Sequence, residues 1–119
     1  MTKELELAKT IARAAVEEHA LDVCILELTP ITVIADYFVI CSGRSGLQIR
    51  SICDAVELYA EESGDRLLRR DGYEEAKWIV LDYGSVIVHI FLPEQREFYR
   101  LEELWSDAQG IELEPSLIH

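Results

Sequence analysis

The chain has 119 residues, half of them hydrophobic, with 23 acidic side chains against 11 basic ones and a formal net charge of -12. This length fits one domain, and the acidity argues against direct binding to DNA or RNA, which depends on basic side chains that displace counterions from phosphates. The same acidity favours a basic protein partner, although it also keeps a small protein soluble. Because the charged N-terminus lacks a signal-peptide core and no apolar run reaches roughly 18–20 residues, we expect a cytoplasmic protein with no membrane partner.

The first half of the chain predicts a helix, two strands and a second helix. Thr2 is a candidate cap for the first helix, in which apolar residues recur at helical spacing. Residues 23–28 are typical of a short strand, and residues 35–42 are apolar enough for a strand buried on both faces. A turn at 43–46 leads into a second helix over 47–62.

The second half predicts three strands and a helix. Residues 66–70 carry the charges of a short edge strand, and the strands "WIVLDY" and "VIVHIFL" are joined by Gly84-Ser85 in a type II′ hairpin. A helix is expected over 92–105, starting at Pro93. The order predicts an α/β (α+β) domain at 1–108, with a mixed sheet of about five strands and helices packed on it, followed by a poorly ordered tail at 109–119. The topology is similar to that of nucleotidyltransferases, without their catalytic residues.

The hairpin register separates two faces. One face is apolar apart from a phenol and is expected to be the core face; it carries Ile79, Leu81, Tyr83, Val86, Val88, Ile90 and Leu92. The other face is mixed, with Trp78, Val80, Asp82, Ile87, His89 and Phe91. Asp82 and His89 are diagonal neighbours on the mixed face, within reach of a hydrogen bond.

No complete catalytic or metal site can be assembled from the sequence. The "GRSG" turn at 43–46 matches neither phosphate-loop pattern, no serine lies in a GxSxG elbow, and His19, His89 and His119 are far apart. Cys24, Cys41 and Cys53 are odd in number and spaced unlike a CxxC motif, so we expect buried free thiols in a reducing compartment. We therefore predict no enzyme activity, no cofactor and no metal.

The mixed face leaves two interpretations open. Asp82 and His89 form either a structural contact beneath the last helix or part of a partner-binding face, where an exposed Trp and Phe beside charges resemble interface hot spots. On the last helix, Phe98, Leu101 and Trp105 are predicted to pack on the sheet. Arg96 and Tyr99 are expected to flank the mixed face.

Three motifs, "ADYFVICSG", "WIVLDYGSVIVHIF" and "REFYRLEELW", occur in an order and at a spacing that closely resemble the ribosomal silencing factor family, also called the Iojap-related family. The resemblance covers about Leu5 to Ala108. The family's recurrent positions correspond here to Asp36, Trp78, Asp82, Tyr83, Gly84, His89, Phe91, Arg96, Tyr99, Leu101, Glu102, Leu104 and Trp105.

The resemblance implies a small domain without enzymatic activity that binds ribosomal protein fourteen of the large subunit, blocks joining of the small subunit and lowers translation when nutrients run short. It also implies a possible homodimer. The candidate partner-binding residues are Trp78, Asp82, Tyr83, His89, Phe91, Arg96 and Tyr99. One alternative is a large-subunit assembly factor that uses the same surface. Another is a metal-dependent nucleotidyltransferase that uses "GRSG" and Asp82, with Asp36 as the best candidate for its second carboxylate.

Overall fold

The structure is a computed structural model that describes residues 2–30, 32–105, 108–111 and 113. Its elements follow the predicted order as far as β5, and two differences appear near the C-terminus. The elements are α1 (Lys3–Glu17), β1 (Leu21–Glu27), β2 (Tyr37–Ser42), α2 (Gly46–Glu62), β3 (Arg69–Asp71), β4 (Trp78–Asp82), β5 (Val86–Phe91), α3 (Pro93–Tyr99), α4 (Leu101–Leu104) and β6 (Gln109–Ile111).

The sheet has the strand order β3-β4-β5-β2-β1-β6. The central pair, β2 and β5, is parallel, and every other neighbouring pair is antiparallel. The strand count is six rather than about five, because residues 109–111 add β6 to the edge of β1. Of the rest of the predicted tail, Leu113 is described, and residues 112 and 114–119 lie outside the described residues. The predicted domain boundary at 108 stays a prediction.

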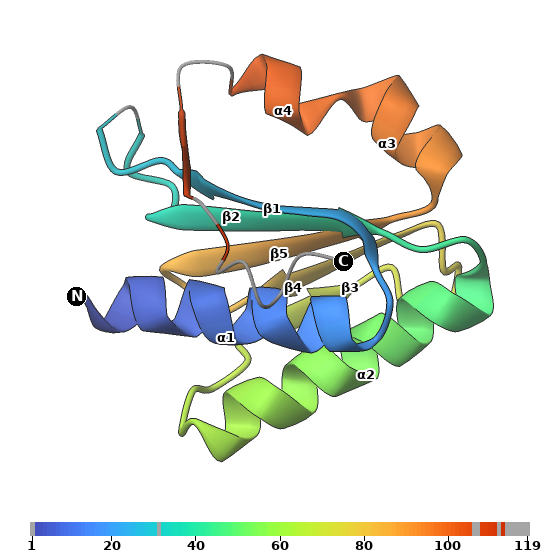
Figure 1. Cartoon of the computed structure of the whole chain (residues 1–119), viewed down its shortest axis with the longest axis horizontal. Helices are drawn as coiled ribbons and strands as arrows, with labels where there is room; N and C mark the ends of the chain where they lie inside the picture. The colour runs from blue at the N-terminus through green and yellow to red at the C-terminus, as the bar shows by residue number, and fades with distance from the viewer. Residues whose placement is uncertain (1, 31, 106–107, 112, 114–119) are drawn as a thin grey trace.

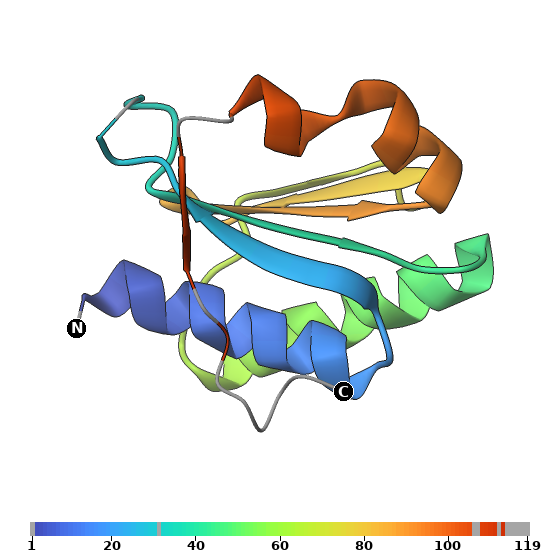
Figure 2. The ribbon, with the colours of Figure 1, turned by 45° about the horizontal axis from the view of Figure 1, so that its top comes forward.

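The molecule has three layers. Helices α1 and α2 cover one face of the sheet, and α3 and α4 lie over the other face, as Figures 1 and 2 show. Every residue of β2 is buried, as its apolar sequence predicts, because the strand has neighbours in the sheet and helical layers above and below. No described helix combines the length and the apolar character that crossing a membrane requires.

The main core lies between the sheet and the layer formed by α1 and α2. Small side chains on one stripe of α1, Ala8, Ala12 and Ala15, are at most 1 % exposed and bring this helix close to its neighbours. A second, smaller cluster lies on the other face of the sheet. Its buried members are Leu28, Ala35, Phe38, Ile40 and Phe91, and side chains of α4 cover part of it. Because Phe91 of the mixed face belongs to this second cluster, part of the mixed face is buried.

Side chains predicted to cap the first two helices do so. The Thr2 hydroxyl accepts the Leu5 amide at 3.1 Å, and the Ser45 hydroxyl accepts the Gln48 amide at 3.1 Å. The side chain of Gln48 in turn accepts the Arg44 amide at 2.6 Å. In the "GRSG" turn, the Gly43 amide donates to the Phe91 carbonyl, so the amides of Gly43 and Arg44 and the Ser45 hydroxyl all have partners within the chain.

The hairpin register is confirmed. Trp78 pairs with Phe91, Val80 with His89 and Asp82 with Ile87. Gly84 has a φ of 87°, which glycine adopts without steric cost. One oxygen of the Asp82 carboxylate accepts the Gly84 amide at 2.7 Å and closes the turn.

The prediction of one continuous helix over 92–105 is wrong. Arg100 has left-handed backbone angles, φ 46° and ψ 54°, and divides the segment into α3 and α4. A break of this kind changes the direction in which the following side chains point. Leu101 and Trp105 pack against the second cluster as predicted, whereas Phe98 is 79 % exposed.

Candidate functional site

The clearest surface feature is a run of four aromatic rings that leads from the core to solvent. Phe91 is fully buried and stacks on Trp78 with a centroid separation of 4.9 Å. The Trp78 ring lies 4.7 Å from that of Tyr99, and Tyr99 meets Phe98 edge to face at 4.9 Å. Trp78 is half-buried, Tyr99 is 47 % exposed and Phe98 is 79 % exposed. We call Trp78, Phe98 and Tyr99 the aromatic surface.

The hairpin and α3 together build this surface. Trp78 is the first residue of β4 and lies opposite Phe91, the last residue of β5. The Leu92 amide donates to the Lys77 carbonyl at 2.9 Å, which holds the open end of the hairpin together. Pro93 then starts α3, which carries Tyr99 back over the sheet to the Trp78 ring.

His89 fixes the orientation of Trp78 from below. The indole Nε1–H donates to His89 Nδ1 at 3.1 Å, so the neutral imidazole carries its proton on Nε2. His89 is 7 % exposed, and burial lowers its pKa to about 4. Its ring lies 4.6 Å from that of Phe38. His89 is therefore an uncharged positioning residue for Trp78 at neutral pH.

Asp82 and His89 do not form the hydrogen bond that the register allows. The carboxylate of Asp82 closes the hairpin turn, and His89 is paired with Trp78. Asp82 also lies four residues from Trp78 along β4, a separation of about 13 Å. Asp36 directly precedes β2, and its backbone amide donates to the Ser85 carbonyl at 2.8 Å, beside the turn that Asp82 closes.

Arg96 attaches α3 to the sheet and to α4. Its guanidinium donates to the Ser42 hydroxyl at 3.0 Å and to the Leu21 carbonyl at 3.4 Å, and it pairs with Glu102 at 2.9 Å. The side chain of Arg96 is only 14 % exposed. Since its donors already have partners within the chain, Arg96 holds the aromatic surface in place from inside.

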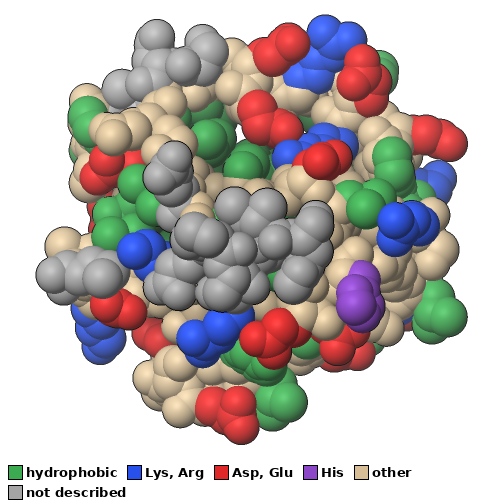
Figure 3. Space-filling view, in the orientation of Figure 1, with side chains coloured by type: hydrophobic (Ala, Val, Ile, Leu, Met, Phe, Trp, Pro, Cys, Tyr) green, Lys and Arg blue, Asp and Glu red, His purple; other side chains and the backbone are tan. Residues whose placement is uncertain are grey.

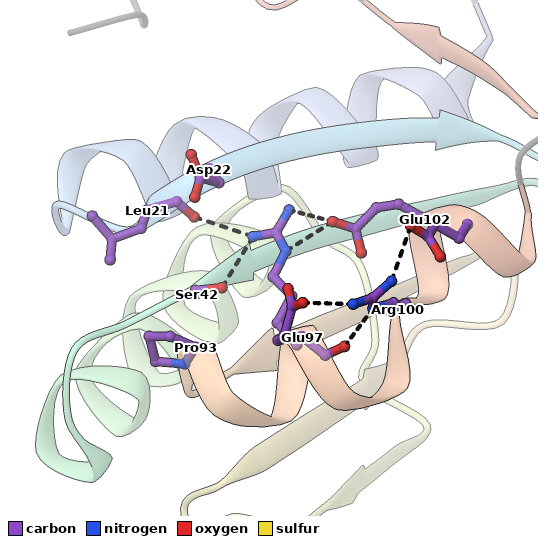
Figure 4. A pocket seen from close by; sticks show the side chains of 9 residues that line it. Leu21, Asp22, Ser42, Pro93, Glu97, Arg100 and Glu102 are labelled. Atoms are coloured by element: carbon purple, nitrogen blue, oxygen red, sulfur yellow. Dashed lines mark hydrogen bonds and ion pairs between the residues drawn. The ribbon is translucent and has the colours of Figure 1, made fainter.

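A hollow of about 540 Å³ lies beside Arg96, between the strands β1 and β2 and the helices α3 and α4. Figure 4 shows Leu21, Ser42 and Glu102 converging there, and Arg100 held by its acidic neighbours. Arg100 pairs with Glu97 at 2.7 Å and with Glu103 at 3.5 Å. Both arginines of the hollow are therefore neutralised internally, which argues against an anion site.

On the face that Figure 3 shows, acidic side chains are spread out rather than gathered in one place. Over residues 93–104, the four glutamates Glu94, Glu97, Glu102 and Glu103 outnumber the two arginines. The aromatic surface therefore borders on helices with a net negative charge. A basic partner would meet both aromatic contact area and favourable charge there.

The seven predicted partner-binding residues divide into groups. Trp78 and Tyr99 form part of the aromatic surface, whereas His89 and Phe91 lie buried beneath it, which contradicts the expectation of an exposed Phe91. The remaining three lie elsewhere: Arg96 is inside the α3 attachment, Asp82 is in the turn, and Tyr83 is on the opposite, α2-covered face of the sheet. That any of them contacts a partner stays a prediction.

Phe98 was predicted to pack on the sheet, but it is a surface residue. Helical spacing in a continuous helix places Phe98, Leu101 and Trp105 on one stripe, so the pattern itself indicated burial. The left-handed Arg100 removes that relation. No local signal in the sequence marks the break, because Arg100 is neither glycine nor asparagine.

All three cysteines are free; Cys41 and Cys53 are buried and Cys24 is half-buried. Cys53, Asp54 and Glu57 place possible ligand atoms within 4.8 Å of one another. Each atom already has a partner: the Cys53 thiol donates to Glu57, Arg70 pairs with Glu57 at 2.9 Å, and the Tyr73 hydroxyl donates to Asp54. Burial and the Glu57 carboxylate raise the pKa of Cys53, which opposes the thiolate that a metal needs.

Comparison with known proteins identifies a family. Residues 2–118 match the family described as "Ribosomal silencing factor during starvation". A "Ribosomal silencing factor RsfS" of Halalkalibacterium halodurans is 39% identical over 92% of this chain and 93% of its own length. The "Mitochondrial assembly of ribosomal large subunit protein 1" of the mouse is 34% identical over 76% of this chain, which corresponds to 41% of that longer protein.

The fold also matches solved structures. A crystal structure of a protein from Chromobacterium violaceum superimposes with a TM-score of 0.86 and 25% sequence identity, and the match covers 94% of this chain and 92% of the other. The family match spans nearly all of the chain, including both the hairpin and the α3–α4 segment that form the aromatic surface. The chain belongs to the ribosomal silencing factor family.

Proposed function

We propose that this protein binds the large ribosomal subunit through ribosomal protein fourteen and, while bound, prevents the small subunit from joining. The observation that carries this proposal is the aromatic surface, in which exposed Phe98 and Tyr99 are supported by half-buried Trp78 and buried Phe91. The names of the bacterial and mouse relatives, a silencing factor and a large-subunit assembly protein, support the choice of partner.

The physical form of the surface suits a protein interface. Rings that already contact one another lose little conformational entropy when they bind, and central aromatic anchors typically contribute about 2 kcal/mol or more each. The net charge of -12 speeds the encounter with a basic ribosomal protein and disfavours bare ribosomal RNA. The specificity then comes from a protein contact rather than from contacts to RNA phosphates.

The mechanism is steric and requires no reaction chemistry. The bound protein and the small subunit compete for one surface, so the fraction of silenced large subunits depends on the protein's concentration and affinity. Such a factor acts in the cytoplasm, where it represses translation under nutrient limitation. A homodimer that used the aromatic surface would compete with the ribosome for it.

An alternative is a role in large-subunit assembly. The name of the mouse relative favours it, because that protein is described by assembly of the large subunit of mitochondrial ribosomes. Both roles use the same docking surface, so binding alone does not separate them. They differ in whether mature subunits still join when the protein is present.

Docking is tested by co-sedimentation of the protein with isolated large subunits. We expect Phe98→Ala to lower the bound fraction strongly. The matched control is Leu47→Ala, because Leu47 is 76 % exposed, close to the value for Phe98, but lies on α2 on the other side of the sheet. The proposal fails if the wild-type protein does not sediment with large subunits, or if the two variants lose binding equally.

A further inference from the structure

The segment of residues 93–105, which we call the strap, is attached to the sheet differently from α1 and α2 (Figure 2). Those two helices each place several buried side chains against the sheet. In the strap, no side chain whose burial the structure describes is buried. A hollow of about 540 Å³ also lies between the strap and the strands β1 and β2. Segments with so few buried contacts open at a lower free energy than the whole fold.

Three contacts at separate points attach the strap to the sheet. Near the middle of the strap, the Arg96 guanidinium donates to a hydroxyl of β2 and to a carbonyl of β1. At the end of α3, the Tyr99 ring lies 4.7 Å from the Trp78 ring. Just after α4, the Trp105 ring meets the Phe38 ring edge to face at 6.0 Å. Water can replace the hydrogen bonds of Arg96 when the strap leaves the sheet, so these attachments are individually weak.

The aromatic surface depends on the closed position of the strap. Trp78 belongs to β4, whereas Phe98 and Tyr99 belong to the strap, so lifting the strap separates the rings. The strap also carries more glutamates than arginines within an acidic molecule, so electrostatic repulsion opposes closure and a basic partner offsets it. A partner that binds only the closed form shifts the equilibrium toward that form.

We propose that the strap opens as one unit while the rest of the fold stays intact, and that docking to the large subunit requires the closed strap. The second part of this inference rests on the proposed function, and the first part does not. Docking then selects a conformation of the protein as well as a surface.

The three cysteines report on this motion because they lie on different sides of the sheet. The Cys24 thiol lies 3.9 Å from the Arg96 guanidinium and packs against the second cluster, on the strap side. Burial raises the pKa of the Cys24 thiol, which slows its reaction while the strap is closed. Cys41 and Cys53 are buried in the main core on the other side. Opening of the strap therefore uncovers Cys24 alone.

The test is labelling of the full-length protein with N-ethylmaleimide, quantified for each cysteine by mass spectrometry of peptides. We expect Cys24 to react about tenfold or more slower than the thiol of an unstructured peptide, and about tenfold or more faster than the two core cysteines. Reaction at the rate of the free peptide would mean that the strap does not cover Cys24. Reaction of all three cysteines in step would mean that the strap leaves only when the whole fold unfolds. Either result would overturn the proposal.

Two variants separate opening of the strap from global unfolding. Ile11→Val removes a methyl group from a fully buried position in the main core. It should speed labelling of the two core cysteines about fivefold and leave Cys24 within about twofold. Arg96→Met removes one attachment of the strap and should speed labelling of Cys24 about tenfold or more. An equal effect of Ile11→Val on all three cysteines, or unchanged labelling of Cys24 in Arg96→Met, would contradict the proposal.

Large subunits test the link to docking. At a concentration about ten times their dissociation constant, they should slow the labelling of Cys24 about tenfold, because the bound strap stays closed over this thiol. If the subunits co-sediment with the protein but leave the labelling of Cys24 unchanged, docking does not require closure and the proposal fails. If they do not co-sediment, the proposed function fails and the link to docking fails with it, whereas labelling of the free protein still decides whether the strap opens.

Discussion

At the scale of single residues, side chains predicted to act together have separate tasks. Asp82 closes a turn, His89 orients an indole and Arg96 attaches a helix. Register alone predicted which face each hairpin residue occupies, because side chains alternate strictly along a strand. It did not predict partners: Asp82 bonds to its own turn and His89 to Trp78 within the hairpin, whereas Arg96 comes from α3. Phe98, which was predicted to pack on the sheet, is instead exposed, and Trp78 stacks on the buried Phe91.

Trp78→Ala should reduce both stability and docking. Trp78 is half-buried and contacts Phe91, His89 and Tyr99, so its truncation should lower the free energy of unfolding by about 2–3 kcal/mol. Phe98→Ala removes a mostly exposed ring and should change that free energy by less than about 0.5 kcal/mol. Urea unfolding measures both values. Equal destabilisation by the two variants would show that Phe98 is part of the core.

His89 should make the fold sensitive to mild acid. Its pKa is lowered from 6.5 to about 4 in the folded chain, so between these values the unfolded state binds the extra proton. Stability is therefore fully present above about pH 6.5 and decreases as the pH falls toward about 4. From about pH 7.5 to about pH 5 the loss attributable to this group is about 2 kcal/mol.

The comparison variant for this effect is His89→Gln, whose amide oxygen can still accept the Trp78 indole N–H. Urea unfolding of both proteins at the two pH values cancels the contributions of the carboxylates. The pH-dependent loss should be about 2 kcal/mol smaller in the variant. An identical pH dependence in both proteins would mean that His89 is not held in its neutral, buried form.

At the scale of elements, the α3–α4 segment determines what the sheet presents to solvent. Capping residues and turn chemistry in the sequence predicted α1, α2 and the hairpin, because those signals are local. The break at Arg100 and the strand β6 carry no such signal. At the break, the Arg100 side chain donates to the Glu97 carbonyl at 2.9 Å and its backbone amide donates to the Arg96 carbonyl at 2.9 Å, and β6 pairs with β1.

Arg96→Met should loosen this segment. The substitution keeps much of the side-chain volume but leaves Ser42, the Leu21 carbonyl and Glu102 without their donor. Because Arg96 is largely shielded from solvent and Glu102 only partly, we expect a loss of about 2 kcal/mol in the free energy of unfolding. Increased amide hydrogen exchange in residues 93–104 should accompany it.

The matched control is Arg69→Met on the edge strand β3, where Arg69 pairs with Asp71 at 2.8 Å but is 73 % exposed. An exposed ion pair contributes about 0–1 kcal/mol, so this variant should remain close to the wild-type protein. If Arg96→Met is no more destabilising than Arg69→Met, Arg96 does not attach α3, and its availability to a partner becomes the better account.

At the scale of the whole molecule, charge and shape divide the work of recognition. The net charge of -12 acts over a distance of about 10 Å at moderate salt and governs encounter, whereas the aromatic surface governs how long the complex lasts. Composition alone predicted the first property. The exposed rings of the aromatic surface could not be predicted from any single segment, because their exposure depends on the break between α3 and α4.

Salt should therefore slow association with large subunits far more than it speeds dissociation. Raising the monovalent salt from about 50 to about 300 mM at constant magnesium should lower the association rate constant about tenfold, because the charges are screened. Surface-immobilised protein and flowing subunits give both rate constants. A rate of association that does not respond to salt would show that the acidity serves solubility alone.

The most direct test of the central claim is a subunit-joining experiment. Purified large subunits are incubated with increasing amounts of the protein before small subunits are added, and joined ribosomes are quantified by light scattering and on sucrose gradients. The account predicts that the yield of joined ribosomes falls as the protein saturates the large subunit, and that Phe98→Ala shifts this fall to higher concentration while Leu47→Ala does not. Undiminished joining at saturating protein would contradict it and would leave large-subunit assembly as the function of the docking surface.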